Sequence, residues 1–333
     1  MNGMDIIAKL KQVNLTGRGG ASFPTYLKWQ SVKDANGSKT YIICNGSEGE
    51  LNVYKDKHIL ENYTEEVLNG IKIALETFHN AQAIIYLNKK YYPKLNQKLK
   101  KLAGKLPITI YRKTGEYIAG EETTLLEAIE NKPHEPRIKP PYPAQKGLYG
   151  YPTLVNNVET FYFVSKIAKG QYKGEKFYSI AGDVKHPGTY LFPETATIKE
   201  IINRTHNWPK HGLFMKSDNF FVQAGGGATG EILLPKELGV PIKGVGSIII
   251  YDRKKTDLYK LMETWADFFV KGNCDKCVPC REGSYRILEM IKHKKIDKEK
   301  LEELYFALEQ TSFCPLGKSI PTAFRSLIKK LDI

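Results

Sequence analysis

Four of the five cysteines fall in the C-terminal part of the chain, at a spacing suited to metal binding. Cys274, Cys277 and Cys280 follow one another at intervals of three residues, and Cys314 comes later. A four-iron cluster needs four sulfur ligands, and such a loop brings three thiolates together while a remote fourth completes the set. Zinc and uncoordinated core thiols are the alternatives, but zinc usually takes two separated C-x-x-C pairs. The odd, clustered count also argues against a disulfide framework, so the spacing favours an iron–sulfur cluster in a reducing compartment.

Two glycine-rich turns each precede an expected helix. The first contains Gly17, Gly19 and Gly20, and the second spans residues 115–120. Glycine lets the backbone approach a ligand closely, and the free amides at a helix start suit a phosphate group. The first turn does not follow the G-x-G-x-x-G spacing. Taken by itself it is equally consistent with a tight turn that binds nothing.

Short apolar runs alternate with helical patterns over the first 170 residues. Residues 41–44 and 83–87 are predicted to be buried strands, and apolar residues at intervals of three and four predict a helix over 65–78. The order strand, helix, strand implies a parallel α/β layer, which usually holds its ligand in the turns between elements. Cys44 ends the first strand and is predicted to be a small buried core residue.

The pattern changes twice further along the chain. From about residue 173 it predicts a small mixed β region, with strands and one brief helix in segments 176–182, 186–192, 198–204, 219–227 and 231–235. From residue 258 the apolar residues recur at amphipathic helical spacing, and the cysteine cluster lies in and after this part. We therefore expect an α/β protein of several domains.

The composition narrows the classes of function. The 333 residues carry a formal net charge of +14, which suits nucleic acid, an anionic membrane or an acidic protein partner. No apolar run approaches the roughly 18 residues of a spanning helix, and the N-terminus lacks the pattern of a secretory signal, so we expect a cytoplasmic protein without direct membrane insertion. Basic residues do not interleave with aromatic ones in a stripe, which disfavours nucleic-acid binding.

Four longer strings carry a specific resemblance. They are GRGGASFPTYLKW (17–29), GEYIAGEETTLLEAIE (115–130), PRIKPPYPAQKGLYGYPTLVNNVET (136–160) and CDKCVPCREG (274–283). In this order they resemble the flavin- and NADH-binding 51-kDa type subunit of respiratory complex I, which is also found in NAD-dependent hydrogenases and formate dehydrogenases. The resemblance implies a Rossmann-like FMN- and NADH-binding domain over 1–172, a β-grasp domain of the soluble-ligand-binding type over 173–250, and a helical [4Fe-4S] domain over 251–333.

The same resemblance assigns roles to individual residues. It implies FMN and one [4Fe-4S] cluster as cofactors, NAD(H) or NADP(H) as substrate, and electrons that leave through the cluster. Glu50 and Glu122 are the expected catalytic residues, and the cluster ligands are Cys274, Cys277, Cys280 and Cys314. Phe23, Lys139 and Tyr142 are expected to line the dinucleotide site together with Glu50. The full set of expected cofactor-binding residues is Gly17, Gly19, Gly20, Phe23, Lys28, Asn45, Glu48, Tyr117, Gly120, Glu121, Lys139, Tyr142, Asn156 and Asn157. The alternative interpretations are core aromatics for Phe23 and Tyr142 and a solvated helix charge for Lys28. For Glu121 and Glu122 the alternative is a pair in the first turn of a helix, favoured by the helix dipole.

The resemblance also implies partners, because electrons that reach the cluster need a further acceptor. We expect a thioredoxin-like [2Fe-2S] subunit and a ferredoxin-like iron–sulfur subunit of a larger redox complex, through which the chain could lie at the inner face of the cell membrane. An N-terminal extension seen in the family is expected to be missing here.

Two departures from the family pattern keep a second function open. Ser47 stands where the family usually has an aspartate near the flavin, and Ser31 stands where it has an aromatic residue. Loss of the acid would change the charge beside the flavin, and loss of the aromatic would remove a stacking surface. The alternative function is therefore a non-catalytic relay or scaffold subunit whose nucleotide site has decayed.

Overall fold

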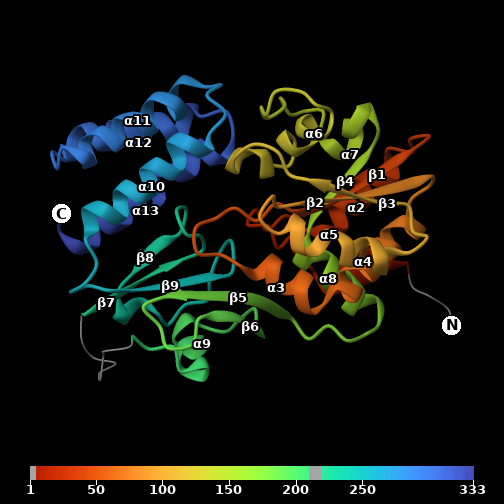
Figure 1. Cartoon of the computed structure of the whole chain (residues 1–333), viewed down its shortest axis with the longest axis horizontal. Coiled ribbons are helices and arrows are strands. Elements are labelled where there is room, and N and C mark those ends of the chain that lie inside the picture. The colour runs from red at the N-terminus through yellow and green to blue at the C-terminus, as the bar shows by residue number, and fades with distance from the viewer. Residues whose placement is uncertain (1–4, 210–218) are drawn as a thin grey trace. The chain divides into compact units, whose positions relative to one another are not determined.

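The computed structural model describes residues 5–209 and 219–333, which form two compact units (Figure 1). The first unit comprises residues up to 49, 54–115 and 119–177, and the second comprises 50–53, 116–118 and 178–333. Two short segments of the N-terminal half thus belong to the second unit.

The first unit is built on a parallel sheet. Within the described residues its four strands are ordered β3-β2-β1-β4, and every neighbouring pair is parallel. The strands are β1 (Thr40–Gly46), β2 (Ala81–Leu87), β3 (Ile108–Arg112) and β4 (Thr153–Asn157). The helices are α1 (Ile6–Gln12), α2 (Thr25–Asp34), α3 (Lys55–Asn62), α4 (Thr64–Thr77), α5 (Tyr92–Ala103), α6 (Thr124–Ile129), α7 (Pro143–Lys146) and α8 (Val158–Ala168), with 3₁₀ turns η1 (Tyr117–Gly120) and η2 (Leu148–Gly150).

Both faces of this sheet are covered, as a parallel sheet requires. Ile43 and Val155 pack with the apolar residues of α6 on one face. Helices α4 and α8 lie side by side on the other (Figure 1). Gly70 allows this close crossing, since a Cβ there would overlap the carbonyl of Phe161. The predicted strands at 41–44 and 83–87 and the predicted helix at 65–78 are confirmed, and Cys44 is buried as predicted.

The second unit combines a mixed sheet with helices. Its five described strands are ordered β6-β5-β9-β7-β8, with β5 parallel to β9 and β7 antiparallel to β8 and β9. They are β5 (Glu175–Gly182), β6 (Gly188–Pro193), β7 (Phe220–Ala224), β8 (Glu231–Leu233) and β9 (Ser247–Asp252). The helices are α9 (Ile198–Thr205), α10 (Leu258–Gly272), α11 (Val278–Lys292), α12 (Lys298–Thr311) and α13 (Pro315–Leu331), with the 3₁₀ turn η3 (Pro235–Glu237).

The mixed sheet is packed on both faces. Ile198, Ile201 and Ile202 of α9 share a core with one face. Phe221 and Ile232 from the strands share another core with helices α10 to α13. This continuous packing joins the expected middle region to the expected helical region in one unit. The mixed α/β class and the helical C-terminal region are confirmed. The three domain boundaries and the β-grasp assignment stay predictions.

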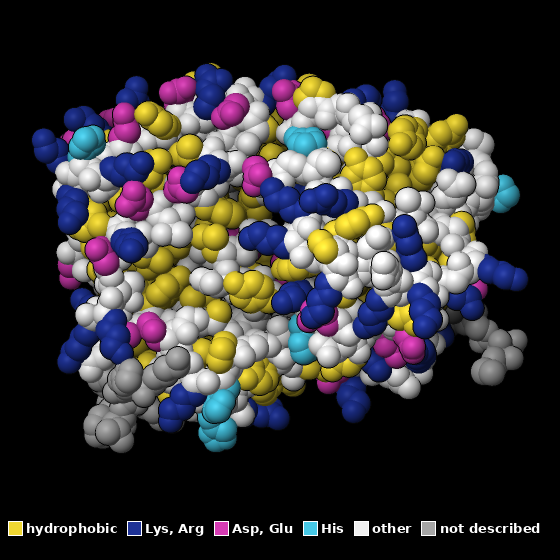
Figure 2. Space-filling view, viewed as in Figure 1, with side chains coloured by type: hydrophobic (Ala, Val, Ile, Leu, Met, Phe, Trp, Pro, Cys, Tyr) yellow, Lys and Arg dark blue, Asp and Glu magenta, His cyan; other side chains and the backbone are white. Residues whose placement is uncertain are grey.

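In the part of the chain that the structure describes, no helix combines the length and the apolarity needed to cross a bilayer. On the face seen in Figure 2, lysine and arginine side chains alternate with acidic and apolar ones.

Candidate functional site

The carboxyl edge of the parallel sheet gathers residues from several of the predicted segments. Asn45, at the end of β1, donates from Nδ2 to the carbonyl oxygen of Gly120 at 2.9 Å. Asn157, at the end of β4, donates to the carbonyl of Asn45 at 3.3 Å. A Cβ on Gly19 would lie 3.4 Å from the Cβ of Asn157, and one on Gly120 would lie 2.5 Å from the Oγ of Ser47. Gly120 therefore packs directly against Ser47, where a side chain would not fit, and both glycine turns lie at this edge of the sheet.

Two anchors of this edge were not assigned a role from the sequence. Arg18 is buried within the glycine turn, and its backbone amide donates to Thr160 Oγ1 at 3.0 Å while its guanidinium reaches the Tyr172 hydroxyl at 3.0 Å. Trp29 donates its indole N–H to Asn156 Oδ1 at 2.9 Å. Asn156 is thereby held by the core of the unit. The sequence signal for this role was an arginine between two glycines of the turn. A buried arginine needs hydrogen-bonding partners, so its presence there indicates a fixed turn.

A cluster of buried charged side chains contacts Asn157 at the same edge of the sheet. Lys55 Nζ lies 2.6 Å from Asp56 Oδ1 and 3.1 Å from Glu159 Oε2. Burial disfavours its charge, but Asp56, Glu159 and Glu48 outweigh burial and raise the pKa of Lys55. Lys55 and Asp56 both also contact the side chain of Asn157, at 3.1 and 2.6 Å. The predicted cofactor residue Asn157 is therefore fixed by a network that the sequence did not reveal.

Glu48 lies in the turn after β1 and is held by three donors. Its carboxylate accepts the amides of Asp56 and Lys57 at 2.9 and 3.2 Å and the hydroxyl of Tyr91 at 3.1 Å. Burial, together with the nearby charge of Asp56, raises the pKa of Glu48 to about 8.

Lys28, Glu121, Glu122 and Lys139 form one ion-pair cluster. Lys28 Nζ is 2.5 Å from Glu122 Oε1, and Lys139 Nζ is 3.0 Å from Glu121 and 3.6 Å from Glu122. Burial opposes the charge of Glu121, but Lys139 and the donors Thr123 and Thr124 hold the pKa of Glu121 below its usual value. Lys28 is thus ion-paired rather than fully solvated. Glu121 also accepts the amides of Thr123 and Thr124 at 2.8 and 2.9 Å. Because α6 begins at Thr124, Glu121 and Glu122 precede the helix and do not form its first turn.

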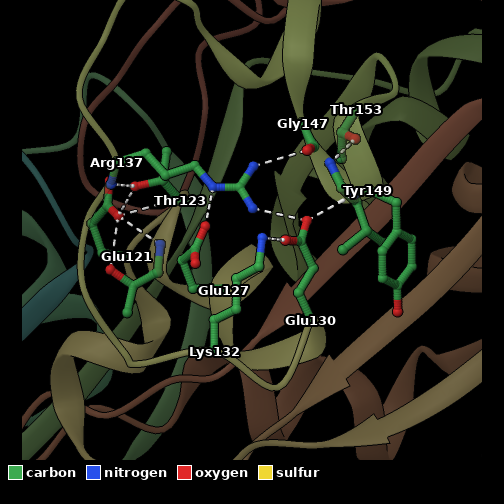
Figure 3. A network of polar contacts seen from close by, with 11 residues as sticks. Glu121, Thr123, Glu127, Glu130, Lys132, Arg137, Gly147, Tyr149 and Thr153 are labelled. Carbon is green, nitrogen blue, oxygen red and sulfur yellow. Dashed lines mark hydrogen bonds and ion pairs between the residues drawn. The ribbon is translucent and has the colours of Figure 1, made fainter.

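Arg137 fixes the loop that carries Lys139 and Tyr142 (Figure 3). Its guanidinium bonds to Glu127, to Glu130 at 2.8 Å and to the carbonyl of Gly147 at 2.8 Å. The other partners of Glu130 are the Tyr149 amide and Lys132. The sequence motif includes Arg137, but we assigned it no role because only the fold brings these partners around it.

The aromatic residues predicted for the dinucleotide are exposed. The exposed fraction is 50% for Phe23 and 54% for Tyr142, so neither is a core aromatic. Ser31 donates its hydroxyl to the carbonyl of Leu27 within α2. Phe23 and Tyr142 thus offer ring faces for stacking, while position 31 does not.

Glu50 and Tyr117 belong to the second unit, where they meet the turn after β7. Glu50 Oε1 accepts the hydroxyls of Tyr117 at 3.0 Å and Thr229 at 2.7 Å, and Oε2 accepts the amides of Gly227 and Ala228 at 3.0 and 3.1 Å. Burial raises the pKa of Glu50, although these donors counteract it. Both carboxylate oxygens are engaged, so Glu50 anchors this turn. Its catalytic role stays a prediction.

The four predicted metal ligands lie in the helical part of the second unit. Cys277 occupies the N-cap position of α11 and Cys314 that of α13, and neither makes a side-chain capping bond. Both helices have 15 or more residues, and their first amides and dipoles favour negative charge at these positions. Cys280 and Cys314 are buried, and Cys274 and Cys277 are partly buried. Three cysteines at two helix starts, with Cys274 in the loop before α11, fit an anionic iron–sulfur cluster.

The four sulfurs act on one another electrostatically. Burial raises the pKa of Cys280, and Cys277, Cys314 and Cys274 raise it further in that order. Among the residues that the structure describes, no three His, Cys, Asp or Glu side chains are grouped as the ligands of a single metal ion. A four-iron cluster makes a different demand, because its four thiolates are distributed over four irons.

A parallel sheet with glycine turns and asparagines at its carboxyl edge, in one chain with four cysteines in and beside the first turns of α11 and α13, is typical of a flavin-type redox protein with an iron–sulfur site. Residues 10–166 match the family described as Nuo51 FMN-binding domain, and residues 260–332 match the NADH-ubiquinone oxidoreductase-F iron-sulfur binding region. An F subunit of the NADH-quinone oxidoreductase of Rhizobium meliloti is 31% identical over 98% of this chain and 86% of its own length. The chain belongs to this family of NADH-quinone oxidoreductase F subunits.

Hydrogenase subunits are also similar. The alpha subunit of the NAD-reducing hydrogenase HoxS of Cupriavidus necator is 31% identical, and the alignment covers 98% of this chain and 59% of that subunit. A crystal structure of an NAD⁺-reducing [NiFe]-hydrogenase in the air-oxidized state matches with a TM-score of 0.88 and 30% identity, over 97% of this chain and 60% of that one. The chain thus spans about three fifths of these hydrogenase chains.

Proposed function

We propose that this chain is the NADH-oxidising subunit of a multi-subunit redox complex, with FMN at the sheet edge of the first unit and a [4Fe-4S] cluster on the four cysteines of the second. When bound, FMN converts a two-electron hydride transfer into single-electron steps and the cluster carries single electrons onward. The observation that carries the proposal is that one chain of this family matches both the FMN-binding domain and the iron–sulfur binding region.

Different residues of the first unit bind different parts of FMN. The glycine turns at Gly19 and Gly120 present backbone amides to the flavin, and Asn45, Asn156 and Asn157 present amide groups that the core holds in place. Lys28 supplies positive charge toward the phosphate of FMN.

Lys139 and the exposed rings of Phe23 and Tyr142 supply charge and stacking surface for the dinucleotide. Glu122 forms ion pairs with both lysines and so orients them. The surrounding complex is of the respiratory NADH dehydrogenase or NAD-reducing hydrogenase type. A thioredoxin-like [2Fe-2S] subunit and a ferredoxin-like subunit are the proposed partners.

The first test is direct analysis of the chain purified without oxygen. We expect one FMN and four irons per chain, and bleaching of the flavin absorbance on addition of NADH. In the Cys314→Ser variant we expect iron to fall while FMN and its bleaching persist, because the two sites use different residues. Cys44→Ser is the matched control, since Cys44 is buried in the first unit. Protein that binds neither flavin nor iron after anaerobic reconstitution would contradict the proposal.

A second measurement separates the scaffold alternative. A scaffold subunit with a decayed nucleotide site would retain iron but would show no flavin bleaching with NADH or NADPH. Rapid-mixing spectra with each nucleotide therefore decide between the two functions and also establish which nucleotide is preferred.

A further inference from the structure

We propose that the hydroxyl of Ser312 donates a hydrogen bond to a sulfur atom of the iron–sulfur cluster and raises the cluster's reduction potential. The inference rests on the proposed function, since it requires the cluster. It adds a residue that tunes the cluster without being one of its ligands.

Ser312 is a buried polar residue next to the last of the four cysteines. It follows the end of α12, two residues before Cys314, and its side chain and backbone together are 5% exposed. Its Oγ is fully enclosed and has no hydrogen-bond partner among the described residues. A buried hydroxyl in that state is costly, so a partner supplied by a bound group is expected.

The position of the hydroxyl points to the cluster as that partner. A Cβ on Gly317, in the first turn of α13, would lie 2.7 Å from the Cβ of Ser312 and 3.1 Å from the Cβ of Cys280. The Oγ of Ser312 would lie even closer to that Cβ than the Cβ of Ser312 does. Ser312 and Cys280 therefore converge on the same glycine, whose missing side chain leaves room between them. Cys280 in turn shares its electrostatic environment with the other three cysteines.

The consequence follows from the charge of the cluster. Reduction adds an electron to a group that is already anionic, and a hydrogen bond to one of its sulfurs stabilises the added charge. The reduced state gains more than the oxidised state, so the reduction potential rises. A serine that only filled space would leave the potential unchanged when its hydroxyl was removed.

The test is a redox titration of the whole chain, loaded with cluster and monitored by electron paramagnetic resonance. We expect Ser312→Ala to lower the midpoint potential, so that the ratio of reduced to oxidised cluster at the wild-type midpoint falls about tenfold. For a one-electron couple that ratio corresponds to about 59 mV. Ser312→Thr, which retains a hydroxyl, should restore most of the shift.

Thr311→Ala is the matched control, because the exposed Thr311 hydroxyl donates to the Ala307 carbonyl at 2.6 Å. Its midpoint potential should equal that of the wild type. If Ser312→Ala does not assemble a cluster, Ser312→Gly is titrated with the same expectation.

Resonance Raman spectra in H₂O and D₂O give a second measurement. Part of the deuterium shift of the iron–sulfur stretches should be lost when the Ser312 hydroxyl is removed. A loaded variant with wild-type potential and wild-type deuterium shift overturns the inference. Wild-type protein that binds no iron contradicts the proposed function instead, so the two failures are distinguishable.

Discussion

Lys139 takes part in a structural ion-pair cluster, and we also propose that it binds the dinucleotide. Its ammonium group lies 3.0 Å from Glu121 and 3.6 Å from Glu122, and burial, which opposes its charge, is outweighed by these carboxylates, so that its pKa is raised. Lys139 therefore stays cationic throughout the neutral range. A fixed cation beside an exposed aromatic ring is the arrangement that a dinucleotide phosphate would need.

Replacing Lys139 with methionine tests this role. We expect the KM for NADH to rise about tenfold, since a charged hydrogen bond contributes about 1.5 to 3 kcal/mol, while the FMN content stays unchanged. Steady-state kinetics with an artificial acceptor measure the effect. Lys94→Met is the control, because Lys94 pairs with Glu61 on the exposed surface. A KM equal to that of the control would remove Lys139 from the nucleotide site.

Glu48 predicts a specific pH dependence of stability. Its pKa is raised to about 8 in the folded protein, whereas an unfolded glutamate titrates near about 4.3. Between these values the folded state holds a proton that the unfolded state has released. The stabilising contribution of Glu48 is therefore complete below about pH 4.3 and is lost as the pH rises through about 8.

The Glu48→Gln variant cannot titrate at this position, so its stability should lack that loss. We expect its unfolding midpoint, relative to wild type, to rise by about 10 °C between pH 5 and pH 9. Each pH unit between pH 5 and the raised pKa costs the wild type about 1.4 kcal/mol, and about 1 kcal/mol moves the midpoint of such a domain by about 2 to 4 °C. Thermal unfolding at several pH values provides the comparison. A constant difference at all pH values would show that Glu48 has an ordinary pKa.

At the scale of elements, the conformation of the loop from 131 to 151 depends on the hydrogen bonds of Arg137. It carries Lys139 and Tyr142, has little regular structure, and is fastened by the guanidinium to α6 and to the Gly147 carbonyl. We expect Arg137→Met to lower the free energy of unfolding by about 1 to 3 kcal/mol, because Glu127 and Glu130 lose a partner. We also expect a higher KM for NADH.

Arg325→Met provides a comparison, because Arg325 pairs with Glu302 and Glu309 on helices of the second unit. It should lower stability without raising the KM. If Arg137→Met left the KM unchanged while lowering stability, the loop would not be part of the nucleotide site.

The elements that the sequence predicted are those defined by local pattern. Residues 41–44 and 65–78 were recognisable because their apolar residues recur with the period of a strand or a helix. The roles of Arg137 and Lys55 were not recognisable, because their partners are distant in the chain. Ser312 was not recognisable either, because only the fold shows that its hydroxyl is buried beside Cys280. Motif resemblance predicted the cofactor segments, but it did not show that Glu50 accepts hydrogen bonds from Tyr117 and from the turn near residue 228.

At the scale of the whole molecule, two short segments carry parts of the flavin motifs into the unit that holds the cysteines. Residues 50–53 and 116–118 belong to the second unit, although their neighbours in sequence belong to the first. The Tyr117 ring lies 4.7 Å from that of Phe268, and a Cβ on Gly272 would lie 3.0 Å from its Cβ. Gly272 ends α10, two residues before Cys274. Within the second unit, Tyr117 thus packs against the helix that leads into the cysteine loop.

The position of residues 50–53 depends on Gly227. A Cβ there would overlap the carbonyl of Leu51, so Gly227→Ala should displace residues 50–53 and weaken the bonds to Glu50. We expect a loss of about 1 to 3 kcal/mol in stability, as for other overpacked sites, together with slower NADH oxidation. Gly239→Ala is the control, because a Cβ there meets nothing within 4 Å. Iron content and cluster spectra should stay unchanged in both variants, since neither touches the cysteines. Wild-type rates and stability in Gly227→Ala would show that the segment is free to shift, and Glu50 would then have no positional role in the reaction.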